Sequence, residues 1–414
     1  MNANHTANTR KTSDRDGFRI RSLVLPFYLP TFLWTAGAGA ILPVLPLYIR
    51  SLGAELSLVG VVMSMFAIGT MIGNVPGSIV IARLGKRRAM IAAVAAEVML
   101  AVAAALVSNP YQLMPILFAL GVVYTLFFVA RLAYFRELVP ADRRGRALSL
   151  LGGETRMGSA VGPVLGGFFA DAFGFRIAFL LLAAFSLSVV VLSVAYLPQD
   201  RPTAASQPGE PRPRTLRVLR ELIREHRRVF VTAGFVVLVL KLVREARKVI
   251  FPLWGDVIGM SSSAIGLLFG FSHVIELALF YPAGSVMDRF GRKKTALPCL
   301  LLFSIGFLAL PAAQAASLFV VAAVLVAIGN GIGAGINMTM STDLAPPVHT
   351  VEFLAVWRTI TDAGGAAGPV VIGFTSAALG IAAAAPVVGT IGLAGAAVMA
   401  FGVGETLKRP APQA

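Results

Sequence analysis

The chain has 414 residues, of which 57% are hydrophobic and only 14% are charged. About a quarter of the residues in an ordinary soluble domain are charged, so this composition indicates an integral membrane protein and excludes disordered, collagen-like and disulfide-rich proteins. The single cysteine, Cys299, excludes an internal disulfide and a cysteine-based metal cluster. The net charge of +16 resembles that of a nucleic-acid-binding protein, but the basic residues lie between long apolar runs, so no nucleic-acid partner is expected.

Twelve apolar stretches are long enough to cross a membrane, which takes about 20 residues of helix. They are predicted over 22–49, 57–82, 89–107, 112–135, 147–170, 176–197, 229–254, 262–287, 295–313, 317–342, 352–377 and 380–402. Residues 1–21 are polar, and the apolar stretch that follows them is too long for a cleavable signal peptide. The expected fold is therefore an all-α membrane protein with twelve transmembrane helices.

The positions of the basic residues predict the orientation of these helices. With the N-terminus in the cytoplasm, 27 of the 36 lysines and arginines fall in cytoplasmic segments. Only Arg50 and Arg176 fall in segments on the outer side of the membrane, and the other seven lie within predicted spans. Cytoplasmic loops of membrane proteins carry such an excess of positive charge. We therefore expect a multi-pass protein of the plasma or inner membrane, with both termini in the cytoplasm.

The chain also repeats itself at a constant shift of 206 residues. The matching pairs include Gly53 with Gly259, Gly60 with Gly266, Pro76 with Pro282, Arg87 with Lys293, and Pro163 with Pro369. This repeat predicts two pseudo-symmetric six-helix bundles, 22–197 and 229–402, with a C-terminal tail over 403–414 and an N-terminal tail over 1–21. Parallel halves of this kind are typical of transporters that work by alternating access.

The segment 198–228 is predicted to connect the halves on the cytoplasmic side. Its first part, Pro198 to Pro213, is rich in proline and polar residues and is expected to be flexible. Its second part, Thr215 to Arg228, has leucines on one helical face and arginines around them. This pattern predicts a basic amphipathic helix on the membrane surface, and a solvated helix without membrane contact is the alternative.

A glycine-rich and basic string follows the eighth predicted span. Its characteristic residues are Gly284, Asp288, Arg289, Gly291 and Arg292. Here the sequence resembles the major facilitator superfamily, whose loop reads G-x-x-x-D-R-x-G-R-[RK]-[RK]. In that family the loop acts as a latch on one conformation, and an aspartate can lie against a helix N-terminus of the other half. The resemblance therefore implies that Asp288 is a conformational latch. The first copy of the loop has Ala82 at this position, and the alternative is that both loops only anchor the chain in the cytoplasm.

The fifth predicted span carries a second string that resembles the family. Its residues Gly158, Gly162, Pro163, Gly166 and Gly167 match the G-x-x-x-G-P-x-x-G-G motif of the antiporter branch. Glycines four residues apart let membrane helices approach closely, and proline bends a helix. The match favours export over import, with ordinary helix packing as the alternative. An arginine that the family places four residues before Gly121 is replaced by Leu117, so its role in proton relay is not carried over.

Charged residues within spans are costly, at about 2.5–3.5 kcal/mol each at the membrane centre. We expect the acids among them to carry the coupled proton, with Glu276 and Glu245 first, followed by Asp362 and Glu154. Arg156 is the expected basic neighbour of Glu276. The family places the third span at the periphery, so Glu97 is expected to serve a contact between helices. The alternative role for Asp362 is a purely structural ion pair with Arg358.

The resemblance further implies a central cavity lined by the first, fourth, seventh and tenth spans. The candidate cavity residues are Trp34, Tyr124, Lys241, Arg244, His273, Asn330 and Asn337. Aromatic side chains beside a few polar groups suit an amphipathic organic solute.

Motifs of other functional classes are missing from the sequence. A phosphate-binding G-x-x-x-x-G-K-[ST] loop is absent, so ATP is not the expected driver, and neither an enzymatic motif, a metal site nor a cofactor is expected. The predicted function is proton-coupled efflux of a small amphipathic molecule such as a drug or secondary metabolite. The expected partners are that solute, protons and the lipid bilayer, and the chain is expected to be monomeric. The alternatives are proton-coupled uptake of a metabolite and, more remotely, a membrane sensor or scaffold that transports nothing.

Overall fold

The computed structural model describes residues 20–140, 143–199 and 215–407, and within these ranges the regular structure is helical throughout. The N-terminal elements are the 3₁₀-helix η1 (Ile20–Leu23), the π-helix η2 (Val24–Tyr28) and the α-helices α2 (Leu29–Ile41), α3 (Leu45–Ser51), α4 (Leu56–Leu84), α5 (Lys86–Leu106), α6 (Pro110–Leu138), α7 (Arg144–Phe173) and α8 (Ile177–Tyr196). The C-terminal elements are α9 (Thr215–Glu225), α10 (Arg227–Val257), α11 (Ser262–Phe290), α12 (Lys293–Ala309), η3 (Leu310–Ala312), α13 (Ala316–Ile332), α14 (Ile336–Leu344), α15 (Thr350–Leu379), α16 (Ile381–Ala397) and η4 (Val398–Gly402).

Each predicted span corresponds to one helix or to consecutive helical pieces. Nine helical segments in the described ranges are long and apolar enough to cross a membrane. The remaining long helices α7, α10 and α15 carry more charged and small residues. The first predicted span is broken between α2 and α3, where Pro43 lacks the backbone N–H that a continuous helix needs. The tenth is broken between α13 and α14, where Gly335 has a φ of 86°.

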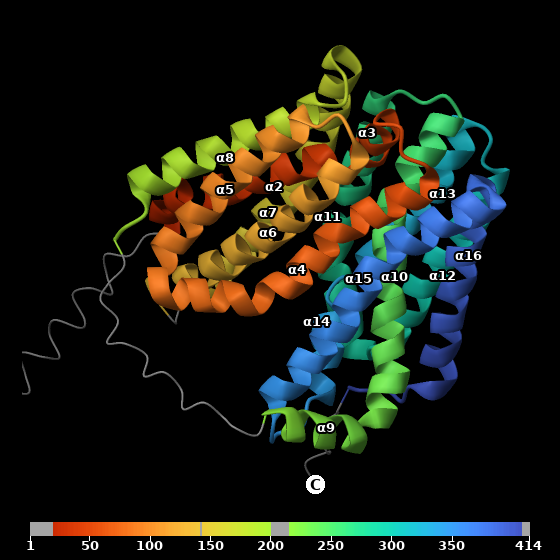
Figure 1. Cartoon of the computed structure of the whole chain (residues 1–414). Coiled ribbons are helices and arrows are strands. Elements are labelled where there is room, and N and C mark those ends of the chain that lie inside the picture. The colour runs from red at the N-terminus through yellow and green to blue at the C-terminus, as the bar shows by residue number, and fades with distance from the viewer. Residues whose placement is uncertain (1–19, 141–142, 200–214, 408–414) are drawn as a thin grey trace, which may run out of the picture.

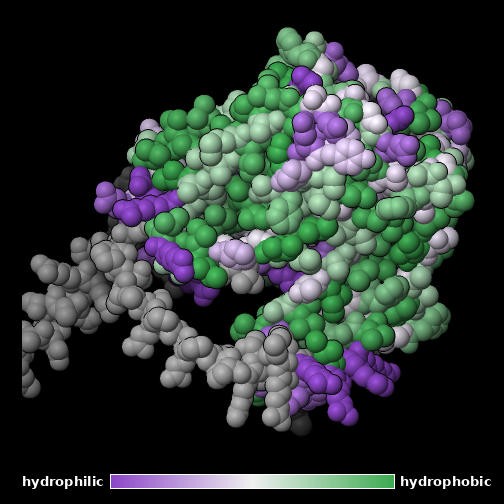
Figure 2. All heavy atoms as spheres, viewed as in Figure 1, coloured by the Kyte–Doolittle hydropathy of each residue, from purple (hydrophilic) through white to green (hydrophobic). Residues whose placement is uncertain are grey.

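The helices form two groups that lie beside each other (Figure 1). We call α2–α8 the N-terminal group and α10–α16 the C-terminal group. The basic end of the molecule is the end that carries Lys86, Arg144 and Arg292, and the opposite end carries Gly53 and Gly259. Between the two groups the surface is hollowed on the side where α9 lies (Figure 2).

The two groups meet through backbone contacts that follow the repeat. A Cβ added to Gly60 of α4 would lie 2.9 Å from the Cα of Gly373 in α15. A Cβ added to Gly167 of α7 would lie 3.1 Å from the Cα of Gly266 in α11. Shifting Gly60 and Gly167 by 206 residues gives Gly266 and Gly373, so the same contact is made twice with the groups exchanged. Only glycine permits so close an approach of two helices.

An ion pair within each group follows the same repeat. Lys86 at the start of α5 pairs with Glu137 at the end of α6. Arg292, which precedes α12, pairs with Asp343 of α14 at 2.7 Å between Nε and Oδ2. Both pairs join equivalent helices at the basic end of the molecule, so the repeat extends to side-chain contacts.

The linker helix α9 packs on α10 and α15 and ends just before α10 begins. Leu222 is buried there, whereas Ile223 stays exposed. Part of the apolar face predicted for this helix therefore contacts the protein. The flexible part predicted over Pro198 to Pro213 lies almost wholly outside the described residues, and membrane contact of α9 remains a prediction.

Candidate functional site

A cavity of about 300 Å³ lies between the two groups of helices. Its lining includes Thr35, Gly39, Met63, Phe66, Glu97 and Tyr124 of the N-terminal group, and Glu245, Lys248, His273, Gly365 and Pro369 of the C-terminal group. Both groups thus contribute to one cavity, as a transporter with its solute site between two halves requires.

The wall formed by the N-terminal group is aromatic. Trp34 and Tyr124 stack with their ring centroids 4.6 Å apart, and Phe66 meets Tyr124 edge-on at 5.5 Å. Arg131 of α6 is buried against this cluster, with its guanidinium carbon 5.3 Å from the Trp34 ring centroid. Phe66 and Tyr124 line the cavity, whereas Trp34 is buried and is not part of the lining. The two lining rings offer an apolar surface with a negative face, which suits a flat or cationic solute.

The wall formed by the C-terminal group is charged. Glu245 of α10 accepts one ion pair from Lys241 and another from Lys248, each at 2.8 Å, so two lysines share one carboxylate. This triad is made by residues three and four apart on one helix, which face the same side. The cavity is therefore amphipathic, with rings on one side and ions on the other.

Glu276 of α11 lies in a second polar cluster beside the cavity. Its Oε1 atom pairs with Nη1 of Arg247 at 2.8 Å, and the Asn330 amide hydrogen-bonds to the same carboxylate. His273, one turn earlier, lines the cavity, and its Nδ1 atom lies 2.8 Å from the carbonyl oxygen of Phe269. The direct ion-pair partner of Glu276 is therefore Arg247. Arg156, the basic neighbour expected from the sequence, also interacts electrostatically with Glu276, and its guanidinium lies over the Phe280 ring.

Glu97 of α5 is the residue that sequence reasoning placed elsewhere. It does contact neighbouring helices, because its Oε2 atom accepts hydrogen bonds from Trp34 Nε1 at 2.9 Å and from Ser186 Oγ at 3.1 Å. It also lines the central cavity, although only 4% of its surface is exposed. The available signal was an isolated acid in the middle of an otherwise apolar span, which is costly unless it has a function.

Two other candidate cavity residues, Arg244 and Asn337, make hydrogen bonds to residues of their own C-terminal group. Arg244 donates from Nη2 to the carbonyl oxygen of Gly333 at 2.8 Å, at the break between α13 and α14. Asn337 accepts from Trp357 Nε1 at 2.8 Å and so joins α14 to α15.

Like Glu276, the predicted coupling acids Asp362 and Glu154 lie outside this cavity lining. Asp362 pairs with Arg358 at 3.6 Å, one turn away on the same helix. Glu154 is half-buried on α7 without an ion pair among the described residues, and its Oε2 atom is buried without a hydrogen-bond partner.

The glycine motif of α7 packs directly on neighbouring helices. A Cβ on Gly158 would lie 2.6 Å from the carbonyl oxygen of Phe32, and one on Gly162 would lie 2.9 Å from the Cα of Gly39. Gly166 faces Ala40 of α2, and Gly167 faces α11 of the other group. Pro163 lies inside the helix, where its carbonyl oxygen faces Gly266. The motif therefore provides close packing both within its own group and between the groups.

The basic loop between α11 and α12 is held within the C-terminal group. Gly291 adopts a φ of 103°, which permits the sharp turn, and Arg292 is buried in its pair with Asp343. Asp288 is exposed over 77% of its side chain and lies 3.5 Å from Arg292. Arg289 lies over the Phe290 ring, and Gly284 has open space around it. In this conformation, the described contacts of Asp288 stay in its own group.

The opposite end of the molecule is closed by polar contacts between the groups. Asp171 of α7 accepts hydrogen bonds from the backbone N–H groups of Ser262 and Ser263, at 2.9 and 2.8 Å, and from the Ser263 hydroxyl. It therefore caps the first turn of α11 from the other group, where the helix dipole favours a negative charge. Arg50 of α3 and Asp256 of α10 add an exposed ion pair at 3.7 Å.

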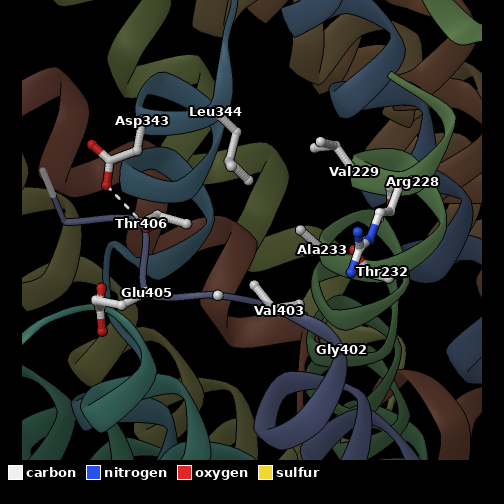
Figure 3. A pocket seen from close by; sticks show the side chains of 11 residues that line it. Arg228, Val229, Thr232, Ala233, Asp343, Leu344, Gly402, Val403, Glu405 and Thr406 are labelled. Carbon is white, nitrogen blue, oxygen red and sulfur yellow. Dashed lines mark hydrogen bonds between the residues drawn. The ribbon is translucent and has the colours of Figure 1, made fainter. Parts of the chain in front are cut away.

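A second cavity, of about 320 Å³, lies at the basic end within the C-terminal group. Figure 3 shows Asp343 and Thr406 joined by a hydrogen bond on one side and Arg228 on the other. Glu405 accepts from the backbone N–H groups of Arg292 and Lys293 and so caps α12. Burial raises the pKa of Glu405, but the backbone N–H groups that it accepts outweigh burial and hold the pKa below its usual value.

Among the residues that the structure describes, no group of three or more His, Cys, Asp or Glu side chains is arranged to hold a metal ion. The titratable groups of the central cavity lining are Glu97, Tyr124, Glu245, Lys248 and His273. Such an arrangement can bind a solute and exchange protons.

The sequence matches the family model of the Major Facilitator Superfamily over residues 27–244 and 246–414. It is 28% identical over 184 residues to the multi-drug resistance efflux pump PmrA of Streptococcus pneumoniae, a match that covers 44% of this chain and 46% of PmrA. The match thus spans about half the length of that relative. Identity to multidrug resistance protein MdtL of Escherichia coli is 24% over 322 residues, covering 78% of this chain and 80% of MdtL.

Solved transporter structures share the architecture of the chain. A POT family transporter in complex with a thioalcohol-conjugated peptide superposes with a TM-score of 0.75 at 12% identity, covering 92% of this chain and 95% of that one. A D-xylose–proton symporter superposes with a TM-score of 0.71 at 18% identity, covering 94% and 98%. The predicted all-α membrane fold is thereby confirmed.

Proposed function

The chain belongs to the Major Facilitator Superfamily, and from that premise we propose that it exports a small amphipathic molecule in exchange for protons. The observation that carries the proposal is the cavity of about 300 Å³ between the two groups of helices, which is lined by Phe66 and Tyr124 on one side and by Glu245 and Lys248 on the other. PmrA and MdtL are named as multidrug efflux or resistance proteins, which supports export. On this proposal the chain is a transporter rather than an enzyme, and it acts as a monomer.

The proposed mechanism is alternating access, in which 22–197 rocks against 229–402. The excess of basic residues supports a cytoplasmic location for the basic end, both termini and the linker. The hollow on the side of α9 and the contacts of Asp171 at the opposite end then correspond to a state that is open to the cytoplasm. In the other state the basic end closes, and Asp288 is the proposed latch for that state.

Proton coupling requires a cavity acid at which binding of a proton and binding of the solute exclude each other. Glu276, Glu245, Asp362 and Glu154 remain the proposed coupling acids from the sequence. In this state Glu276 and Glu245 are partners of basic groups, so a proton taken up by either acid has to open an ion pair. On this proposal, a proton that reaches Glu276 from the outer side of the membrane breaks the ion pair between Glu276 and Arg247.

Proton-coupled uptake is the second candidate function, and the lysine triad supports it. A proton on Glu245 would leave Lys241 and Lys248 without their shared carboxylate. The two lysines would then bind an anion, so that the proton and the anion enter together. This order of events describes symport.

Probe accumulation in intact cells separates the two functions. Ethidium, a flat cation, and fluorescein, an anion, are measured with and without the protein and with and without an uncoupler. Lower ethidium accumulation that the uncoupler reverses supports export, and higher fluorescein accumulation that the uncoupler abolishes supports uptake. Equal accumulation of both probes in all four conditions contradicts both transport functions and favours the sensor or scaffold.

A further inference from the structure

The acids buried within the described spans differ in whether a basic group neutralises them. Glu245 has two lysines, Glu276 has Arg247, and Asp362 has Arg358. Glu154 has no ion pair among the described residues, but it does not line the cavity, although the next residue, Thr155, does. Glu97 is the acid that combines a place in the cavity wall with the lack of an ion pair among the described residues.

The helices packed around Glu97 bring few charges toward it. α2, which supplies Trp34, and α8, which supplies Ser186, contain no charged residue. α4 carries Arg83 at the basic end, and α5 itself carries its basic residues in its first turn. On α6 the titratable group that interacts with Glu97 is Tyr124, and Arg131 lies on the Trp34 ring rather than on the carboxylate.

An unpaired carboxylate in a dry site is expensive, because a buried charge needs a counter-charge or hydrogen bonds. The indole and hydroxyl donors satisfy one oxygen of Glu97, and they serve the neutral acid as well as the carboxylate. A single proton removes the remaining cost. A positively charged or hydrogen-bond-donating group of a solute removes the same cost from the cavity side.

We propose that Glu97 is the acid at which the transported proton and the solute exclude each other. The inference rests on the proposed export function, and it assigns the coupling step to a residue on a different helix from the acids above. Open to the cytoplasm, Glu97 releases its proton to water and binds the solute as a carboxylate. Open to the outside, it takes a proton from water, and the solute leaves. One proton enters for each solute released at this site.

Ion-paired acids do not offer this exchange as directly. Protonation of Glu276 or Glu245 exposes a buried base, which itself needs a new partner. At Glu97 the proton leaves no base uncovered. The side chains that hold the carboxylate, Trp34 and Ser186, therefore act as positioning residues for the exchange.

The test uses the full-length protein reconstituted in vesicles, with ethidium as the transported probe. Glu97→Gln keeps an oxygen that accepts from Trp34 and Ser186, so folding is expected to be preserved. We expect at least a tenfold loss of transport driven by a pH gradient and weaker binding of ethidium, because the amide mimics the protonated acid that excludes the solute. Glu55→Gln, at an exposed acid outside the cavity lining, is the matched control and retains transport driven by the gradient. Uphill transport that persists in Glu97→Gln overturns the inference.

A spectroscopic measurement keeps the inference testable if ethidium is not transported. The infrared carbonyl band of a protonated carboxylic acid is recorded in the solubilised protein as the pH is varied. We expect a titrating band that is present in the wild type and in Glu276→Gln and missing in Glu97→Gln. An unchanged band in Glu97→Gln contradicts the assignment. If the wild type transports no probe but shows the titrating band that Glu97→Gln lacks, the export function is rejected and the protonation of Glu97 is not.

Discussion

The contact between Asp171 and α11 makes a quantitative prediction about the balance of conformations. Asp171→Ala removes three hydrogen bonds that the first turn of α11 makes with the other group. Loss of a helix cap costs about 0.5–2 kcal/mol. Because three hydrogen bonds are lost together, we expect a cost in the upper part of this range, about 1–2 kcal/mol, which changes the ratio of two states about 5- to 30-fold. Since this carboxylate joins the two groups, the loss destabilises only the state that is closed at the opposite end.

Pulsed electron paramagnetic resonance measures this balance as a distance distribution. Labels at Ser108, between α5 and α6, and at Gln314, between η3 and α13, report the separation of the groups at the opposite end, where both residues are exposed. Cys299 is fully buried and does not compete for label. In Asp171→Ala the long-distance population is expected to grow about 5- to 30-fold relative to the short-distance population.

Asp256→Ala is the matched control for this experiment. It breaks the exposed pair with Arg50 at the same end, and exposed pairs contribute about 0–1 kcal/mol. Its effect on the distance distribution is therefore expected to be smaller than that of Asp171→Ala. Equal distributions in the wild type and Asp171→Ala, or an equal shift in both variants, would refute the view that the carboxylate holds this end closed.

Three further predictions concern the basic end. A cysteine at Arg212 is expected to resist impermeant reagents in intact cells while one at Arg50 reacts, and the reverse pattern would invert the proposed orientation. Asp288→Asn is expected to reduce ethidium export severalfold at normal expression while Ala82→Asp has a mild effect, and unchanged export would leave the loop as an anchor. The lowered pKa of Glu405 means that its stabilisation is complete above the unfolded pKa of about 4.3 and is lost as the pH falls through the folded pKa. Glu405→Gln should therefore melt at a lower temperature than the wild type at pH 7, and the difference between the two melting temperatures should narrow below about pH 4. A difference that stays constant with pH would contradict this.

The helices and the repeat were accessible from sequence because they depend on local composition. Apolar length defines a span, and a fixed shift of 206 residues aligns Gly60 with Gly266 without reference to structure. The triad of Lys241, Glu245 and Lys248 was also accessible in part, because residues three and four apart share a helix face.

Contacts between different helices could not be predicted in the same way. The pair of Arg247 with Glu276 depends on how α10 and α11 are rotated about their axes, which hydropathy does not report. Glu97 was assigned to the periphery because the family places the third span there. The structure brings it to the cavity wall through its hydrogen bond with Trp34 of the first span, and only tertiary packing determines that meeting.

The paired glycine contacts between the groups also bear on how fast the groups separate. Gly60 against Gly373 and Gly167 against Gly266 place backbone on backbone, with no side chains of these residues to interdigitate. Parting such surfaces requires no rotamer changes at these four positions, so their contribution to the activation barrier is small. The energy that favours the closed arrangement lies instead in discrete polar contacts such as that of Asp171. We therefore expect substitutions at the glycine pairs to act mainly on how readily the groups separate, and substitutions at Asp171 to act mainly on the resting population.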